Sequence, residues 1–168
     1  MAMLKYGGNA GRGGHQLTER TSEQVFAARE EAAAFFGGKP ENTIFCLNCT
    51  HALNLAIQGI VQPNDHVIIS NLEHNAVLRP VAAMVRERGV QCSIAPVSVD
   101  DKETIAAFRA RIRPNTRAMI CTLASNVTGQ ILPYRELAAL CNEHDICMIA
   151  DGAQACGTLP VQMSDGIN

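Results

Sequence analysis

The sequence has no long hydrophobic run and no excess of either charge, and each absence excludes a class of function. No apolar stretch approaches the roughly 20 residues that a membrane-spanning helix needs. The 14 Lys and Arg residues stand against 16 Asp and Glu, a net charge of −2. The chain therefore lacks the basic patch that binds nucleic-acid phosphates or an anionic membrane. We expect a soluble protein whose partner is a small molecule or another protein, with no nucleic acid and no membrane.

The chain also lacks a secretory signal and a disulfide pattern. Its first residues, MAMLKYGGNAGRGG, contain no apolar signal segment. The seven cysteines are odd in number and mostly lie inside apolar runs, as reduced core thiols do. Cys46-x-x-Cys49 has no second cysteine pair, so we expect no metal site. These features predict a cytoplasmic protein.

What is present is the composition of one globular domain. The 168 residues are 47% hydrophobic and 18% charged, enough to form a sizeable core. Residues 1–17 are rich in glycine and have no hydrophobic period, so we expect a loop or arm there. Residues 18–168 are expected to form the folded part.

Strand-like and helix-like patterns alternate along that part. A helix is expected from Thr21, with Gln24 at capping-box spacing, to a stop at Gly37-Gly38. The expected strands are residues 43–47, 66–70, 90–95, 118–124 and 146–150. The expected helices are residues 50–61, 75–88, 100–112 and 133–143. This alternation predicts an α/β fold with three layers and a mostly parallel sheet.

Helical spacing also predicts which side chains face the core. In the first helix these are Val25, Ala28, Ala32, Phe35 and Phe36. In helix 75–88 they are Val77, Leu78, Val81, Met84 and Val85, with Gly89 ending the helix.

Polar side chains follow the expected strands at the point where each strand ends. Ligands of open α/β sheets bind outside the carboxyl ends of the strands. The polar residues expected there are Asn48, Cys49, Thr50, His51, Asn71, Glu73, His74, Asn75, Ser125, Asn126, Thr128, Asp151 and Gln154. We therefore expect a pocket at this edge of the sheet.

Three of these residues indicate what the pocket holds. Thr50 places a hydroxyl beside the unpaired N–H groups of a helix start, which suits a phosphate, although a simple N-cap explains it too. Asp151 ends a buried strand and needs a partner such as a protonated ring nitrogen. His74 offers a flat ring, and in isolation it could equally be an ordinary histidine. Because the glycine-rich loops of dinucleotide and P-loop sites are absent, a phosphorylated, nitrogen-containing aromatic cofactor fits best.

Several segments together resemble a known family. They are Gly11-Arg12-Gly13-Gly14-His15, Thr50, Asn71-Leu72-Glu73-His74-Asn75, Ala124-Ser125-Asn126-Val127-Thr128-Gly129 and Asp151-Gly152-Ala153-Gln154-Ala155. In this order and spacing they resemble the large domain of class V aminotransferases, which are pyridoxal-phosphate (PLP) enzymes of fold type I. The cysteine desulfurase and selenocysteine lyase branch is the most similar.

The resemblance implies a role for each matching position. The cofactor-binding residues that it implies are Cys49, Thr50, His51, His74, Asn126, Asp151 and Gln154. Thr50 and its neighbours would bind the phosphate, and His74 would stack on the pyridine ring, with proton transfer as a second, catalytic role. Asn126 would lie by the cofactor and the substrate carboxylate. Asp151 would pair with the pyridinium nitrogen, and Gln154 with the phenolic oxygen.

Two parts of the family pattern have no match in this chain. The Schiff-base lysine should lie roughly 20–30 residues beyond the aspartate, whereas only 17 residues follow Asp151 and none is lysine. Lys5, Lys39 and Lys102 do not match its context. The small C-terminal domain, where desulfurases keep their thiol nucleophile, has no counterpart either. We therefore expect residues 18–168 to be part of a PLP-binding large domain.

The resemblance implies a cysteine desulfurase type of activity in the intact enzyme, giving alanine and an enzyme-bound persulfide. The expected partners are cysteine, a second copy of the chain in a homodimer, and a sulfur-acceptor protein. Other class V activities remain open: a transaminase, a selenocysteine lyase or an epimerase. A catalytically inactive fragment that serves only as a binding or dimerisation module is the alternative of a different class.

Overall fold

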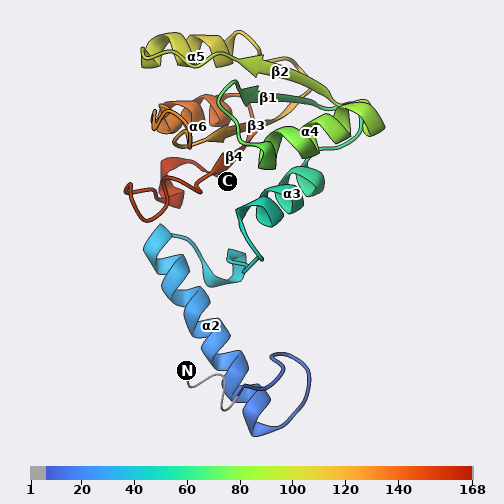
Figure 1. Cartoon of the computed structure of the whole chain (residues 1–168), viewed down its shortest axis with the longest axis vertical. Coiled ribbons are helices and arrows are strands. Elements are labelled where there is room, and N and C mark those ends of the chain that lie inside the picture. Colours follow the sequence, from blue (N-terminus) through green and yellow to red (C-terminus); the bar gives the residue numbers. More distant parts are fainter. Residues whose placement is uncertain (1–6, 168) are drawn as a thin grey trace. The chain divides into compact units, whose positions relative to one another are not determined.

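The computed structural model describes residues 7–167 (Figure 1). The chain divides into two compact units, of which the first ends at Phe45 and the second begins at Cys46. No helix in the described range is long and apolar enough to cross a membrane.

The first unit consists mainly of helix α2, Gln16–Phe36, followed by the short 3-10 helix η1, Pro40–Asn42. The predicted start at Thr21 is wrong, because His15 is the N-cap and its Nδ1 accepts from the Thr18 N–H at 3.4 Å. Thr21 lies inside the helix and donates its hydroxyl to the Leu17 carbonyl. The predicted stop is confirmed: Gly37 is left-handed, with φ 66°.

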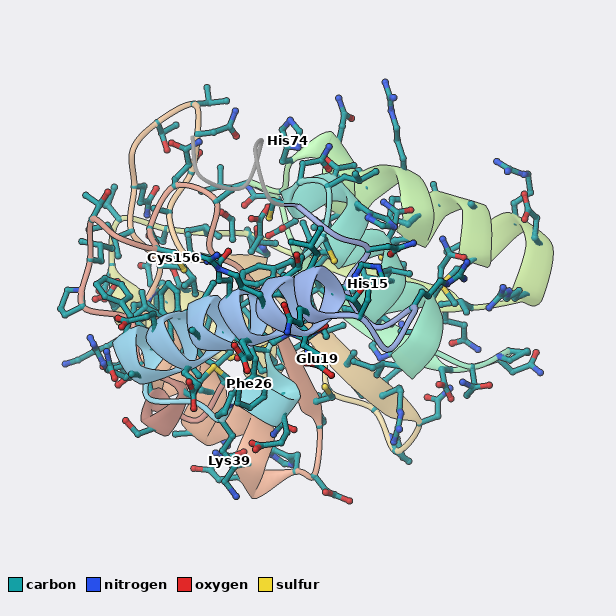
Figure 2. All side chains as sticks on the ribbon, turned by 90° about the horizontal axis from the view of Figure 1, so that it is seen from below. His15, Glu19, Phe26, Lys39, His74 and Cys156 are labelled. Carbon is teal, nitrogen blue, oxygen red and sulfur yellow. The ribbon has the colours of Figure 1, made fainter. Side chains whose placement is uncertain are left out.

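The predicted core face of α2 is wrong in part. Ala28 and Phe35 are exposed, whereas Thr18, Thr21 and Ala33 are buried. Among the described residues of this unit, only a three-residue 3-10 helix accompanies the 21-residue α2, which is too little to cover an apolar stripe. Figure 2 shows Glu19 and Phe26 along this helix after His15.

Within the predicted glycine-rich arm, residues 7–15 contain no helix or strand, and α2 begins at Gln16. The rest of that prediction, residues 1–6, lies outside the described residues. The predicted strand 43–47 is wrong. Ile44, Phe45 and Leu47 are 65%, 56% and 87% exposed, and no strand of the described sheet pairs with this segment. An apolar run forms a strand only where a neighbour accepts its backbone hydrogen bonds.

The second unit is a four-stranded parallel sheet with helices on both faces. Its strands are β1, β2, β3 and β4, at His66–Ser70, Gln91–Ala95, Thr116–Thr122 and Cys147–Asp151, in the order β2-β1-β3-β4. Its α-helices are α3, α4, α5 and α6, at Cys49–Ile60, Asn75–Arg88, Asp101–Arg109 and Tyr134–Glu143, and the 3-10 helix η2 follows at Met163–Asp165. The predicted bounds of β1 and α4 are confirmed to the residue, and most others within two or three.

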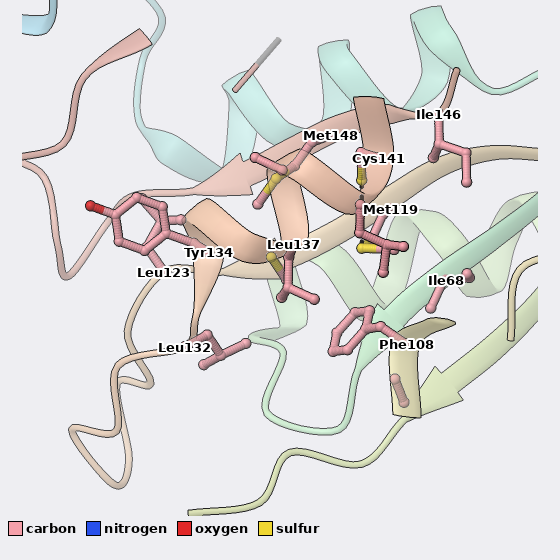
Figure 3. Close-up of a cluster of buried hydrophobic side chains, with 14 of the residues drawn as sticks. Ile68, Phe108, Met119, Leu123, Leu132, Tyr134, Leu137, Cys141, Ile146 and Met148 are labelled. Carbon is pink, nitrogen blue, oxygen red and sulfur yellow. Dashed lines mark hydrogen bonds between the residues drawn. The ribbon is translucent and has the colours of Figure 1, made fainter. Parts of the chain in front are cut away.

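Two buried clusters, one on each face of the sheet, confirm the three-layer prediction. Val67 and Ile69 of β1 pack in one cluster with residues of α3 and α4. Ile68 between them packs in the other cluster with Phe108 of α5 and residues of α6. Successive strand residues thus face opposite layers. Figure 3 shows the second cluster, in which the Cys141 thiol lies 3.6 Å from the Met119 sulfur.

The predicted core face of α4 is too wide. Val77, Val81 and Met84 are buried, but Leu78 and Val85 are 38% and 42% exposed. Each of these two residues follows a buried one by a single position, about 100° around the helix, which places it at the margin of the buried stripe.

Candidate functional site

A pocket lies where the strands end and the helices α3 and α4 begin. Its lining residues are Cys49, Thr50, His74, Ala76, Thr122, Asn126, Asp151, Ala153 and Gln154. They enclose about 500 Å³ of empty space, part of which is open to solvent. All of them belong to the second unit. The pocket brings together every cofactor-binding residue that the family resemblance implies except His51.

His51 lies in the first turn of α3 but does not line the pocket. Its side chain is exposed, and its Nδ1 accepts from the Leu47 N–H at 3.5 Å. Its backbone N–H donates to Asn48 Oδ1 at 2.9 Å, so His51 contributes to the capping of the helix.

The start of α3 provides an anion site on one wall of the pocket. Asn48 is the N-cap, in an extended conformation, and Cys49 and Thr50 are the first helical residues. Backbone N–H groups in this position have no acceptor within the helix, and the helix dipole adds a partial positive charge. The Thr50 hydroxyl lies on the same wall. This wall can bind a phosphate group.

Asp151 provides the negative charge of the pocket. It ends β4 and is only 4% exposed. Its Oδ1 accepts from the Ala153 N–H at 3.0 Å and from the Cys49 thiol at 3.3 Å. A buried carboxylate is stabilised by a charged or hydrogen-bonded partner, so a protonated ring nitrogen in the pocket would suit it.

The turn after Asp151 fixes the shape of this side of the pocket. A Cβ on Gly152 would collide with the Cys156 sulfur, so any other residue there requires the Cys156 side chain to move. Glycine at this position lets the chain turn tightly and bring Ala153 and Gln154 into the lining.

Cys49 is a hydrogen-bond donor here. Partial burial raises the pKa of its thiol to about 11, and the negative charge of Asp151 and the hydrogen bond to it act in the same direction. The thiol is therefore protonated at neutral pH. The prediction that the cysteines are core or near-core residues is wrong for Cys49 and Cys156, which are exposed. Both interact with Asp151 at the pocket rather than packing in either buried cluster.

His74 and Asn126 stand where the pocket meets a second hollow. His74, labelled in Figure 2, is the N-cap of α4. Its Nδ1 accepts from the Ala76 N–H at 3.1 Å, so the neutral ring carries its proton on Nε2. The second hollow shares these two residues and is also lined by Asn71, Leu72, Glu73, Asn75, Ser125, Val127 and Thr128.

Two residues of the site received no role from the sequence. Thr122 lines the pocket because it pairs with Asp151 in the β3–β4 register. Glu73 is buried between β1 and α4, although it is a carboxylate in a polar stretch. The only feature of the sequence that could have indicated a role for Glu73 is its position directly before His74, the N-cap of α4. In residues 7–167, no group of three or more His, Cys, Asp or Glu side chains is placed to hold a metal ion.

Comparisons with known proteins agree with this geometry. The family model described as aminotransferase class-V matches residues 2–166. A cysteine desulfurase of Serratia proteamaculans is 32% identical over 149 residues, which is 86% of this chain and 37% of that protein.

Solved structures share the fold. A lysine-to-alanine mutant of C-DES, with glycine covalently linked to its PLP cofactor, has a TM-score of 0.84 at 24% identity, covering 97% of this chain and 44% of that one. SspA in complex with cysteine has a TM-score of 0.83 at 25% identity, covering 92% of this chain and 46% of that one.

The chain spans less than half the length of each of these proteins. The match to the family model nevertheless extends over almost all of it, and the motifs from which the resemblance was inferred fall inside the matched range. The chain belongs to the aminotransferase class-V family.

Proposed function

We propose that this chain forms the cofactor-binding part of a PLP-dependent enzyme that removes sulfur from cysteine. Family membership and the similarity to a cysteine desulfurase support the proposal. The observation that carries it is the pocket itself, where the buried Asp151 and the start of α3 lie on the same lining.

The residues present fit a phosphorylated pyridine. The N–H groups and the hydroxyl at Cys49 and Thr50 suit the phosphate. Asp151 suits the protonated ring nitrogen, and the amide of Gln154 can donate to the phenolic oxygen. His74 supplies a ring for stacking at the opening shared with the second hollow. No lysine is among the described lining residues of the pocket, so none of them could form the Schiff base with PLP.

Bound PLP supplies an electron sink for the bonds around the substrate α-carbon. The residues of this chain prepare for that chemistry. Asp151 would hold a proton on the ring nitrogen, because its buried carboxylate is stabilised by a cationic partner. In the structure its Oδ1 accepts a hydrogen bond from the Cys49 thiol, so the thiol and a ring N–H would share this carboxylate. Asn126 can donate its amide to the substrate carboxylate from the margin of the pocket.

The binding test uses pyridoxamine phosphate, because the aldehyde of PLP also reacts with surface amines. We expect saturable binding by this chain, and affinity about tenfold or more weaker in Asp151→Ala and Thr50→Ala, since each removes a buried or charge-assisted hydrogen bond. Fluorescence titration measures both. Glu136→Gln, at an exposed carboxyl of α6, is the control and should bind as wild type does. Unchanged affinity in both pocket variants would contradict the site.

The reaction is tested on the longest gene product that contains this chain. Cysteine should yield alanine and protein-bound or reducible sulfur. A keto acid instead of alanine would indicate a transaminase, alanine from selenocysteine alone a selenocysteine lyase, and racemised substrate an epimerase. No turnover with intact cofactor binding would favour a binding or dimerisation module.

We also propose a homodimer in the cytoplasm and a sulfur-acceptor protein as a further partner. The family resemblance supports these proposals, and the exposed apolar side chains of Ile44, Phe45 and Leu47 support the homodimer. Light scattering on the purified protein measures the first, and a mass of one chain would contradict it.

A further inference from the structure

Glu73 joins the ends of two strands beside the pocket. Its side chain follows β1 and is buried, with 8% of the residue exposed. Its Oε1 accepts from the Ser70 hydroxyl at the end of β1 and, at 2.9 Å, from the Thr122 backbone N–H at the end of β3. The Ser70 hydroxyl oxygen in turn accepts from the Leu72 N–H at 3.1 Å.

The carboxyl replaces a missing strand acceptor. Successive N–H groups of a strand point to opposite neighbours. The Leu123 N–H donates to the Asp151 carbonyl on the β4 side at 2.9 Å, so the Thr122 N–H points to the β1 side. Because β1 has ended at Ser70, no backbone carbonyl of β1 remains for it, and Glu73 Oε1 provides the acceptor.

The same carboxyl group favours its neutral form. Oε2 is buried and has no hydrogen-bond partner in the described chain. The pKa of Glu73 is raised to about 7, chiefly by burial and in part by the negative charge of Asp151 on β4, and the hydrogen bonds from Ser70 and Thr122 oppose the shift. On β3, the buried Cys121 thiol also interacts electrostatically with Glu73, and His74 follows it in the chain.

These contacts form one path between two walls of the pocket. Glu73 precedes His74, the N-cap of α4, and holds Thr122, which pairs with Asp151. We propose that Glu73 is a positioning residue of the cofactor pocket, which fixes the His74 turn to the end of the sheet that carries Asp151. This inference rests on the proposed cofactor site for its consequence, but the positioning itself can be measured without ligand.

The ligand-free test compares two variants by NMR. Glu73→Gln keeps an acceptor for the Thr122 N–H, and Glu73→Ala removes it. In Glu73→Ala we expect the Thr122 amide to exchange about tenfold faster and the ring signals of His74 to shift, and in Glu73→Gln both should return to the wild-type pattern. Glu87→Gln, an exposed glutamate at the far end of α4 paired with Arg86, is the matched control and should change neither. Wild-type His74 signals in Glu73→Ala would overturn the proposal.

The ligand test adds a pH profile that a merely structural role would not change. Pyridoxamine phosphate should bind about tenfold more weakly to Glu73→Ala than to Glu73→Gln at pH 6. Between pH 6 and 8.5 the affinity of the wild type should change relative to that of Glu73→Gln, because only the wild type gains a second buried negative charge beside Asp151. Changes common to both proteins belong to His74, Asp151 and the ligand.

The outcomes separate the two proposals. If no protein binds pyridoxamine phosphate while the NMR differences hold, the cofactor site fails and the positioning role stands. If binding is normal and the pH profiles of wild type and Glu73→Gln coincide, ionisation of Glu73 does not affect the pocket, and the inference that its neutral form is required there is wrong. Should Glu73→Ala fail to fold, the Glu73→Gln profile still decides.

Discussion

At the scale of single residues, the contact between Cys49 and Asp151 couples a thiol to the charge of the pocket. The thiol donates to Oδ1 at 3.3 Å, and its pKa is raised to about 11 partly by that carboxylate. Since the thiolate is the form that reacts with alkylating agents, the reactivity of Cys49 reports the charge at position 151.

Asp151→Asn should therefore speed alkylation of Cys49. Removing the charge lowers the pKa of the thiol. Each unit by which this pKa falls increases the thiolate fraction about tenfold near neutral pH. Iodoacetamide labelling at pH 8, followed by mass spectrometry of the peptides, measures the rate. The half-exposed Cys46 serves as the internal reference. An unchanged ratio of Cys49 to Cys46 labelling would contradict the coupling.

The sequence alone indicates which residues lie at the carboxyl edge of the sheet, because these residues follow the predicted strands directly. Thr50, His74 and Asp151 line one pocket, because the carboxyl edge of a parallel sheet collects whatever follows its strands. The side-chain direction of His51 within one helical turn is not encoded in spacing. The role of Glu73 depends on which N–H the end of β1 leaves unpaired, and that is known only once β1 and β3 are placed side by side.

At the scale of elements, the amino ends of three strands meet at His66. This residue of β1 is fully buried. Its Nδ1 lies 2.8 Å from Thr116 Oγ1 on β3, and its Nε2 lies 2.9 Å from Ser93 Oγ on β2. Burial, and then the charge of Arg113, lower the pKa of His66 from 6.5. The imidazole is therefore neutral in the folded protein at neutral pH.

The stability of the chain should consequently fall below pH 6.5. There the unfolded state binds a proton that the folded state does not, so the contribution of His66 is complete above pH 6.5 and is lost as the pH falls. Urea unfolding of wild type and His66→Gln at pH 7.5 and 5.5 measures this. The wild type should lose more stability on acidification than the variant, whereas the exposed His144→Gln should behave as wild type. Glu73 acts in the opposite direction, because its raised pKa makes stability fall as the pH rises from 4.5 to 7. Equal pH dependence of wild type and His66→Gln would contradict the role of His66.

The elements that spacing predicts are those that bury a face within the second unit. β1 and α4 match because a fully apolar strand and a capped, periodic helix leave little choice. Segment 43–47 is equally apolar but has no strand beside it, and composition cannot indicate a missing neighbour. The start of α2 is mispredicted because histidine at position 15 takes the capping role usually given to Thr or Ser.

At the scale of the whole molecule, core and pocket belong to one unit. Both buried clusters begin after residue 46, and so do all pocket residues. The covering helices α3 to α6 are in the same unit. The described buried residues that stabilise the sheet therefore all lie in the second unit.

A chain that begins at Cys46 should fold and keep the pocket. We expect a cooperative thermal transition and an affinity for pyridoxamine phosphate within about threefold of the full chain, because no lining side chain is removed and surface changes have small effects. Circular dichroism and the fluorescence titration check this. A chain that unfolds, or binds far more weakly, would show that the first unit supports the second.

The tight turn after Asp151 has a consequence for sequence variation. A Cβ at position 152 would collide with the Cys156 sulfur at 2.3 Å but would lie 3.5 Å from the Cys156 Cβ, an ordinary contact. The two positions are therefore not independent. In a saturation library, alanine at 152 should survive only together with alanine or glycine at 156. Variants that carry both substitutions would have a different turn after Asp151 while the aspartate itself stays in place.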